Sequence, residues 1–200
     1  MMLGRVDEVD GHFVATNFVA LTVPTKCLYV SRKSPRSTSG GAQDIHIQTD
    51  MRSVALGYGR VWLPVVAVAV PLLQATLGPV HVMTWISSAL LLGVSVVAHR
   101  SGRLSEEEKA RLRVLGTVTG LRIDPSKLHQ RTREIKRAVL GELMDKGGIP
   151  MTHDGILSVL EDIPMPAMPL VYGYARYAGD TPEWQECAAL VYQRLEDGDL

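Results

Sequence analysis

A stretch without charged residues lies in the middle of this 200-residue chain. Between Arg60 and Arg100 there is no Asp, Glu, Lys or Arg, and 26 of the residues in 61–98 are apolar. A helix that crosses a bilayer needs about 20 mainly apolar residues, so this stretch is long enough for two spans. The turn-forming pair Gly78-Pro79 divides it. We therefore expect a hairpin of two transmembrane helices, residues 61–77 and 80–98, joined by a turn at 78–79.

Basic residues flank both outer ends of the predicted hairpin and are absent from its turn. Arg52 and Arg60 precede the hairpin, whereas Arg100 and Arg103 follow it. Lys and Arg close to membrane helices favour the cytoplasmic side. The sequence therefore predicts a multi-pass protein of the cytoplasmic (inner) membrane with both termini in the cytoplasm.

A few polar and small side chains interrupt the two predicted spans. The second span has three hydroxyl groups on one helical face and a small-xxx-small pair, which permits close packing. Helix packing, within the hairpin or with a second copy, is the favoured interpretation, and a polar pathway for a substrate or ion is the alternative. No Asp, Glu, Lys or Arg marks such a pathway. The candidate packing residues are Gln74, Thr84, Ser88, Ala89, Gly93 and Ser95.

The first 60 residues predict a small cytoplasmic β unit. Strand-forming residues at 12–23, 27–30 and 43–49 indicate a short antiparallel meander. The Gly- and Ser-rich residues 31–41 predict a solvated loop, and contact with anionic lipid is the alternative for its basic side chains Arg32, Lys33 and Arg36.

Residues 99–200 predict a cytoplasmic bundle of five short helices. Ser105 and Glu108 form the pattern of a capping box, and Gly120 ends the first helix. Asp124-Pro125 begins a second helix that runs to about Lys146. Its expected buried stripe consists of Leu128, Ile135, Val139 and Leu143, which are seven, four and four residues apart.

The fold class expected from these parts is an α+β membrane protein. It combines an N-terminal antiparallel β unit (residues 1–60), a transmembrane helical hairpin (61–98) and a C-terminal helical bundle (99–200).

No residue pattern in the chain indicates catalysis or metal binding. The six histidines are scattered, and no CxxC, HExxH, P-loop or nucleophile-elbow motif occurs. Cys27 and Cys187 fall in apolar patterns and are interpreted as packed thiols. We expect a non-enzymatic protein without a cofactor and identify no small-molecule substrate.

Six basic residues lie close together after the hairpin. Anionic lipid, an acidic protein or RNA are candidate partners for such a cluster. The favoured interpretation is charge matching with the chain's own C-terminal part, since residues 99–146 carry a net charge of +5 and residues 147–200 carry −7. The whole chain is neutral, which argues against a general affinity for nucleic acid. The cluster consists of Arg122, Lys127, Arg131, Arg133, Lys136 and Arg137.

Two short patterns in the first 100 residues resemble a loose group of uncharacterised bacterial two-span membrane proteins. One is a strand pair of the form F-x5-P-x3-L-Y-V, here Phe18 to Val30. The other is R-S-V…Y-x-R-x-W, here Arg52 to Trp62, which precedes the two spans. The resemblance implies a bacterial membrane protein and no particular activity.

Together these observations predict a membrane-anchored adaptor or scaffold. The lipid bilayer and a protein, which is either another polypeptide or a second copy, are its expected partners. The alternative is an accessory subunit of a membrane transport or envelope-assembly complex.

Overall fold

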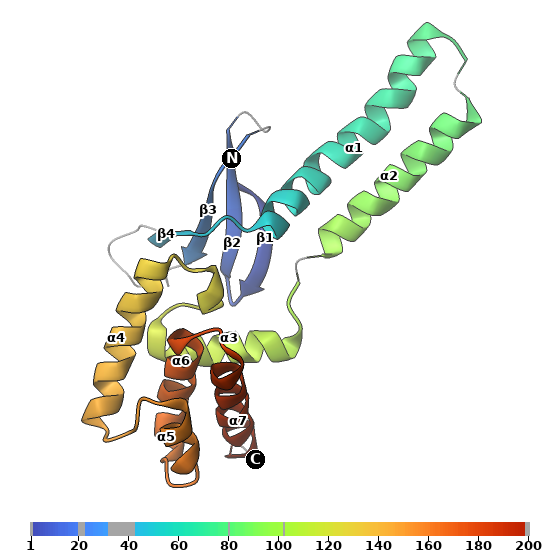
Figure 1. Ribbon diagram of the computed structural model, residues 1–200. Coiled ribbons are helices and arrows are strands. Elements are labelled where there is room, and N and C mark those ends of the chain that lie inside the picture. Colours follow the sequence, from blue (N-terminus) through green and yellow to red (C-terminus); the bar gives the residue numbers. More distant parts are fainter. Residues whose placement is uncertain (1, 20–22, 32–42, 80, 102, 199–200) are drawn as a thin grey trace. The chain divides into compact units, whose positions relative to one another are not determined.

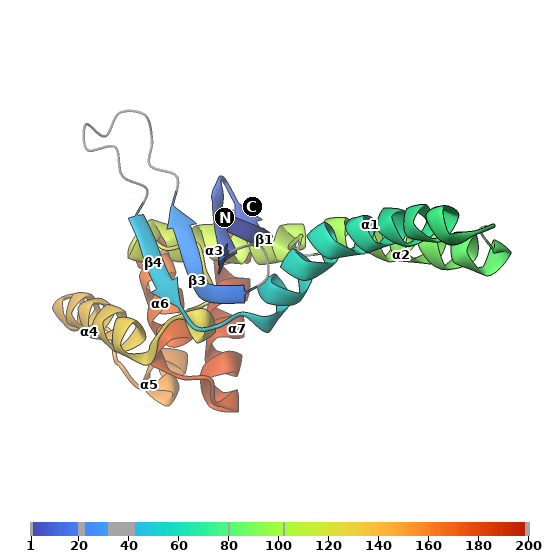
Figure 2. The same cartoon turned by 90° about the horizontal axis from the view of Figure 1, so that it is seen from above.

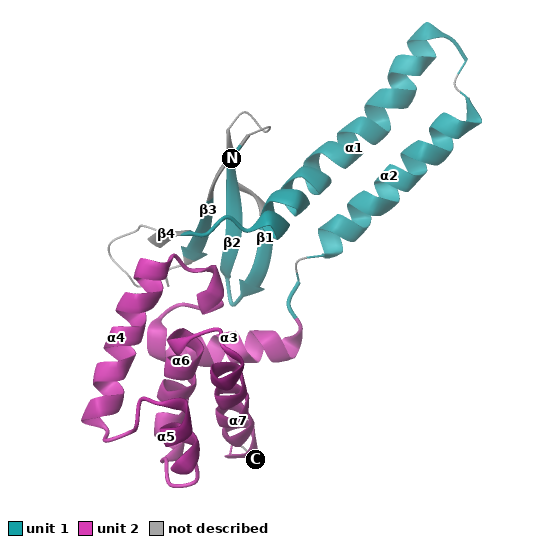
Figure 3. Ribbon diagram, viewed as in Figure 1, with its two compact units in different colours: residues 1–104 teal, residues 105–200 magenta. Residues whose placement is uncertain are grey.

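A computed structural model describes residues 2–19, 23–31, 43–79, 81–101 and 103–198 (Figure 1). The chain forms two compact units, residues 1–104 and 105–200 (Figure 3). The first unit contains a β-sheet and two long helices, and the second contains helices. The protein is therefore α+β.

Four antiparallel strands form the sheet, and each pairs with its neighbour in sequence. The three strands expected from the sequence correspond to the last three of these. The predicted loop with Arg32, Lys33 and Arg36 lies outside the described residues. The strands are β1 (Met2–Val9), β2 (His12–Val19), β3 (Val23–Ser31) and β4 (Gln43–Ile47).

Strand β1 is not anticipated by the sequence analysis. Its pairing with β2 shifts register on both sides of Val6, and Asp7 has a positive φ of 55°. These irregularities break the period-two alternation by which a strand is recognised in sequence. Val6 and Val9 are nevertheless fully buried, so the strand contributes to the core of the unit.

Helix α1 (Met51–Leu77) begins ten residues earlier than the sequence predicts. The side chain of Asp50 caps it by accepting hydrogen bonds from the backbone N–H groups of Arg52 and Ser53. Its first turns pack against the sheet, where Ser53 and Val54 are buried. One continuous helix thus links the β-sheet to the apolar stretch, and it runs across the expected boundary at residue 60.

A hydrogen-bonded polar cluster joins the start of α1 to the sheet. The hydroxyl groups of Thr16 on β2 and Ser53 on α1 lie 2.8 Å apart. The Thr16 hydroxyl also lies 3.3 Å from the sulfur of Cys27, which accepts a hydrogen bond from the backbone N–H of Asp50. The side chains of Thr16, Ser53 and Cys27 are all buried, so this cluster fixes the position of the helix start.

Helix α2 (Val82–Arg100) returns antiparallel beside α1, as both views of the ribbon show (Figures 1 and 2). By length and composition, both helices are able to cross a membrane. The helical hairpin predicted from the sequence is therefore present.

Arg60 holds the end of the hairpin that lies next to the sheet. Its guanidinium group donates hydrogen bonds to the backbone carbonyls of Ala98 (3.0 Å), Ser101 (2.7 Å) and Arg5 (2.7 Å). The first two carbonyls belong to the C-terminal end of α2, where helix carbonyls have no partner within the helix. Next to Arg60, Gly59 allows close approach, because a Cβ there would lie 3.3 Å from that of Ala98.

The second unit contains the five helices expected from the sequence. They are α3 (Glu106–Thr119), α4 (Gln130–Lys146), α5 (His153–Ser158), α6 (Met168–Ala178) and α7 (Pro182–Gly198). The short 3-10 helices η1 (Pro125–Lys127) and η2 (Met165–Ala167) lie between them. The capping box of Ser105 and Glu108 and the left-handed Gly120 at the end of α3 are both present.

Helix α6 lies at the centre of this unit and contacts α3, α4 and α7. Its Met168, Val171 and Ala175 are completely inaccessible to solvent. Cys187 and Val191 of α7 are equally inaccessible, so this side of the last helix is part of the core.

The buried stripe predicted for α4 is wrong. Leu128 is buried, but Ile135, Val139 and Leu143 are 56%, 51% and 44% exposed. Asp124 caps η1 and not α4, which begins only at Gln130. The inner side of α4 is instead formed by Leu140, Gly141 and Met144.

Replacing Arg60 by Ala is expected to loosen the end of the hairpin next to the sheet. Hydrogen bonds to charged groups are among the stronger ones in proteins, and three are lost. We expect amide hydrogen exchange in residues 97–104 of the detergent-solubilised chain to accelerate about tenfold. Arg60→Lys should be intermediate, since an ammonium group lacks the planar fork of donors. The more exposed Arg52→Ala is the control, and equal exchange in both Ala variants would contradict this role.

Candidate interaction surfaces

Four polar residues of the hairpin, Gln74, Thr84, Ser88 and Ser95, lie between its two helices. Ser88 and Ser95 of α2 are 6% and 4% exposed, and Ala67 and Pro71 of α1 are also buried. The hydroxyl of Thr84 donates a hydrogen bond to the side-chain oxygen of Gln74. This arrangement favours helix packing over a polar pathway, because the hydroxyl face of α2 is turned towards α1.

The small residues Ala89 and Gly93 lie on a different face of α2. Both are exposed, and a Cβ added at Gly93 would meet no atom within 4 Å. They therefore do not form the contact between α1 and α2. The outward surface of the hairpin is otherwise strongly apolar, with exposed Val65, Val68, Leu72, Leu73, Met83, Trp85, Ile86, Leu90, Val96 and Val97.

Arg133, Lys136 and Arg137 of the basic cluster make contacts within the second unit. Arg133 binds the carboxylate of Asp180 through both terminal nitrogens, at 2.6 and 2.9 Å. Lys136 donates a hydrogen bond to the carbonyl of Thr119 at the end of α3. The Arg137 guanidinium lies 5.9 Å from the centre of the Tyr174 ring. Among these three contacts, the Arg133–Asp180 pair is the one that matches charge with the C-terminal part of the chain.

The other three basic residues are arranged differently. Arg122 and Lys127 are half-buried near η1, and Arg131 is exposed at the start of α4. Of the six residues, Arg131 and Arg137 are exposed and the other four are partly covered.

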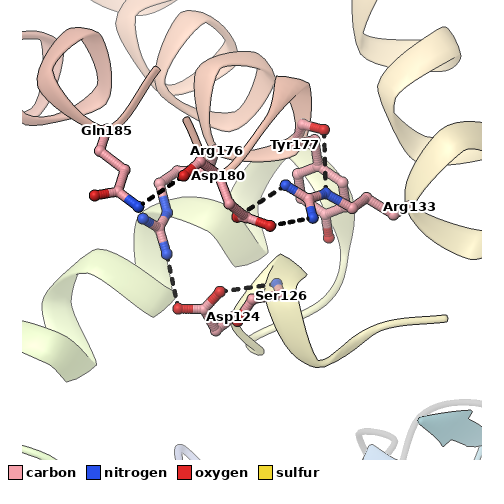
Figure 4. A network of polar contacts seen from close by, with 7 residues as sticks. All are labelled: Asp124, Ser126, Arg133, Arg176, Tyr177, Asp180 and Gln185. Atoms are coloured by element: carbon pink, nitrogen blue, oxygen red, sulfur yellow. Dashed lines mark hydrogen bonds and ion pairs between the residues drawn. The ribbon is translucent and has the colours of Figure 1, made fainter. Parts of the chain in front are cut away.

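A polar network connects α4, η1 and the end of α6 (Figure 4). Asp124 binds Arg176 at 2.7 Å and accepts a hydrogen bond from the backbone N–H of Ser126. Arg133 also donates to the carbonyl of Tyr177 at 3.4 Å, beside its ion pair with Asp180. Hydrogen bonds from Arg133 lower the pKa of the Asp180 carboxyl. The network holds the basic side of α4 against its own unit.

The orientation of α4 reverses the usual arrangement of an amphipathic helix. Its side towards the unit carries Arg133 and Lys136 together with a few core residues, whereas its outward side carries Ile135, Val139 and Leu143. Core-facing stripes are normally the apolar ones. Positions that break the usual pattern of apolar residues inside and polar residues outside concentrate at functional sites. The outward face of α4 with Ile135, Val139 and Leu143 is therefore the strongest candidate surface of the second unit.

A shallow groove of about 500 Å³ lies beside α4, on a side of the helix that does not include Ile135, Val139 or Leu143. Its floor includes Met151 and Tyr174, and its rim is mainly acidic. Gly141 keeps this floor open, since a Cβ there would already touch both Met151 and Tyr174 at 3.4 Å. The charged lining residues are Glu134, Arg137, Glu142 and Asp145.

The cysteines and histidines form no candidate reactive site in the described part of the chain. Cys27 and Cys187 are free and buried. Burial raises the pKa of the Cys187 thiol to about 11, which leaves it protonated at neutral pH. No group of three or more metal-ligating side chains occurs among the residues that the structure describes.

Comparison of the chain with known protein families, with characterised proteins and with solved structures finds no match. The resemblance to bacterial two-span membrane proteins therefore stays a prediction.

Replacing Asp180 by Asn is expected to alter how stability depends on pH. The ion pair with Arg133 makes its full contribution to the free energy of unfolding above the carboxyl pKa of the unfolded state, about 3.9. Because the pKa of Asp180 is lower in the folded state, this contribution is lost as the pH falls through that lower pKa. At pH 7 we expect the variant to lose about 0.5–1 kcal/mol of unfolding free energy, because the pair is partly exposed.

The measurement is denaturant unfolding in detergent, followed by Trp184 fluorescence with Trp62 and Trp85 replaced by Phe. The difference in unfolding free energy between the parent and the Asp180→Asn variant should shrink as the pH falls through the lowered pKa of the folded-state carboxyl, and disappear below that pKa. Glu186→Gln, on the exposed side of α7, is the control. A difference that persists unchanged at low pH would refute the role of the ion pair.

Substitutions at adjacent positions of α2 should separate its two faces. Ser88→Leu places extra volume in the packed seam and is expected to destabilise the hairpin by about 1–3 kcal/mol. Ala89→Leu points outward and should leave stability unchanged. Thermal unfolding of the detergent-solubilised chain measures both. A larger effect at Ala89 would show that the outward face, and not the seam, carries the helix packing.

Proposed function

We propose that this chain is a non-enzymatic adaptor or scaffold, held in the cytoplasmic membrane by the α1–α2 hairpin, with a helical unit that binds protein. The observation that carries the proposal is the outward apolar face of α4. The second unit has a completed core around α6, so this face is not needed for its own folding. A binding surface explains why apolar side chains point away from that core.

Membrane anchoring is supported by the polarity of the hairpin. Its outer surface is mainly apolar, and Ser88 and Ser95 are buried between the two helices, as suits a hairpin surrounded by lipid and not by water. The arginines at both outer ends and the turn without charge favour termini in the cytoplasm. An accessory subunit of a membrane transport or envelope-assembly complex is the second candidate, favoured by the outward Ala89 and Gly93.

Extraction and topology measurements test the anchor. We expect the full chain to stay in the membrane pellet after alkaline carbonate treatment. A reporter fused at Gly78 should lie on the far side of the membrane, and one fused at Leu200 should lie in the cytoplasm. Release by carbonate, or two cytoplasmic reporters, would overturn the proposed anchoring.

Site-specific photo-crosslinking in native membranes tests the adaptor function. A crosslinking residue at Val139 should give a discrete adduct, whereas one at Thr117 on the exposed side of α3 should give none. Adducts with polytopic membrane proteins from position 93, and none from 139, would favour the accessory subunit. Absence of adducts from both 139 and 93 would contradict both candidates.

A further inference from the structure

Four arginine residues of the first unit lie where the helical hairpin meets the sheet (Figure 1). Arg60 joins the chain segments there, because its guanidinium group donates hydrogen bonds to one carbonyl of β1 and to two carbonyls at the end of α2. We call these four residues the basic collar. They are Arg5, Arg60, Arg100 and Arg103, and all except Arg60 are exposed.

The acidic residues of the same unit lie away from the basic collar. Strand β1 passes Arg60 at Arg5, and two residues later the side chain of Asp7 reaches Arg52. Arg52 precedes Arg60 by about 12 Å along α1, so β1 leads away from the apolar part of the hairpin. The strand pairing puts Asp44 at that same far end of the sheet. The acidic residues at or towards this end are Asp7, Glu8, Asp10, Asp44 and Asp50.

The positive charge of the collar is therefore not balanced within the unit. Among the residues that the structure describes, no carboxylate pairs with any of the four arginines. The Arg5 guanidinium lies 4.0 Å from the centre of the Phe13 ring, and Arg60 binds carbonyl oxygens, so both side chains keep their full charge. Arg52 differs from them, because it lies 4.0 Å from the buried carboxylate of Asp7.

The lengths of the apolar segments put the collar at the depth of lipid headgroups. Residues 61–77 and 82–98 contain no Asp, Glu, Lys or Arg, and each is about 25 Å long as a helix. The hydrocarbon core of a bilayer is about 30 Å thick, so Arg60 and Arg100, close to the ends of these segments, are held at its boundary. Tyr58 and Trp62 lie one turn apart on α1 at the same level, and such side chains favour the headgroup region.

We propose that the basic collar binds the phosphate groups of anionic phospholipids, in the leaflet on the side of the sheet. The proposal rests on the membrane anchoring above and names the headgroup chemistry that the anchor prefers. Guanidinium groups form paired hydrogen bonds with phosphate oxygens. Basic residues next to a membrane helix also attract anionic lipids through their electric field.

The surface beside the collar favours a lipid over a soluble anion. Val96 and Arg100 lie one turn apart on the same face of α2, and both side chains are exposed. A phospholipid matches this order, because its acyl chains can cover the valine while its phosphate binds the arginine. A soluble anion uses the charge alone and leaves the apolar side chain uncovered.

Spin-labelled lipids measure the preference for the full chain reconstituted in phosphatidylcholine vesicles. A trace of spin-labelled phosphatidylglycerol or phosphatidylcholine is added, and the fraction of label immobilised by the protein gives a relative association constant. We expect the anionic lipid to associate about fivefold more strongly, the factor for one arginine near a lipid surface. Raising the salt concentration from about 0.1 to about 1 M should reduce this preference, because it shortens the Debye length from about 10 to about 3 Å.

Substitutions that remove charge assign the preference to the collar. A variant with Arg5→Gln, Arg100→Gln and Arg103→Gln should bring the ratio of association constants towards one. Arg60 stays unchanged because it also holds the hairpin. Arg52→Gln is the matched control and should keep the preference, since this arginine lies about 12 Å further from the apolar segment than Arg60. Thermal unfolding of the variants should match that of the parent, because the replaced side chains are exposed.

The remaining outcomes separate this inference from the proposed anchor. Equal association of both spin-labelled lipids with the parent chain would overturn it, as would an equal loss of preference in the Arg52→Gln and collar variants. A preference that survives in the collar variant, but is lost when Arg131 and Arg137 are both replaced by Gln, would assign the lipid to the second unit and also overturn it. A chain that resists carbonate extraction without any lipid preference keeps its proposed anchor, whereas release by carbonate removes both proposals.

Discussion

The rotation of α4 about its own axis is the constraint on which the surface of the second unit depends. Arg133 binds Asp180 with both terminal nitrogens, and Lys136 binds the carbonyl of Thr119. Turning the helix to bury Ile135 and Val139 would break these contacts and leave Asp180 without its cation. Because charge-assisted bonds are geometrically specific, they hold Arg133 and Lys136 against the unit. The apolar side chains of Ile135, Val139 and Leu143 are then left outside.

The two units expose apolar surface in different ways, and the difference separates their proposed partners. The hairpin is mainly apolar on its outer surface and has Ser88 and Ser95 buried between the helices, which suits a lipid environment. The exposed apolar face of α4, formed by Ile135, Val139 and Leu143, is narrow and has the charged residues Glu142 and Lys146 beside it. Such a face suits another helix, which covers the apolar side chains while charged side chains pair at the edges. Anchoring and binding are thus assigned to separate parts of the chain.

Local signals predicted most of the elements. The capping box of Ser105 and Glu108 correctly located the start of α3, and the left-handed Gly120 located its end. Strand β1 was missed because its register shifts hide the alternation, and α1 begins at Met51 because Asp50 caps a helix whose first turns pack on the sheet. The face of α4 was assigned wrongly because periodicity reports that a helix is amphipathic, not which side meets the core.

The sequence alone determined the hairpin, since a long stretch without charge has few other stable structures, and it determined the number of C-terminal helices through their caps. Tertiary structure decided what those helices present. Asp180 lies 47 residues after Arg133, and only folding brings them together. That long-range pair reverses the expected orientation of α4, because an ion pair formed between distant residues is invisible to a local pattern. The candidate binding surface therefore exists only in the folded unit.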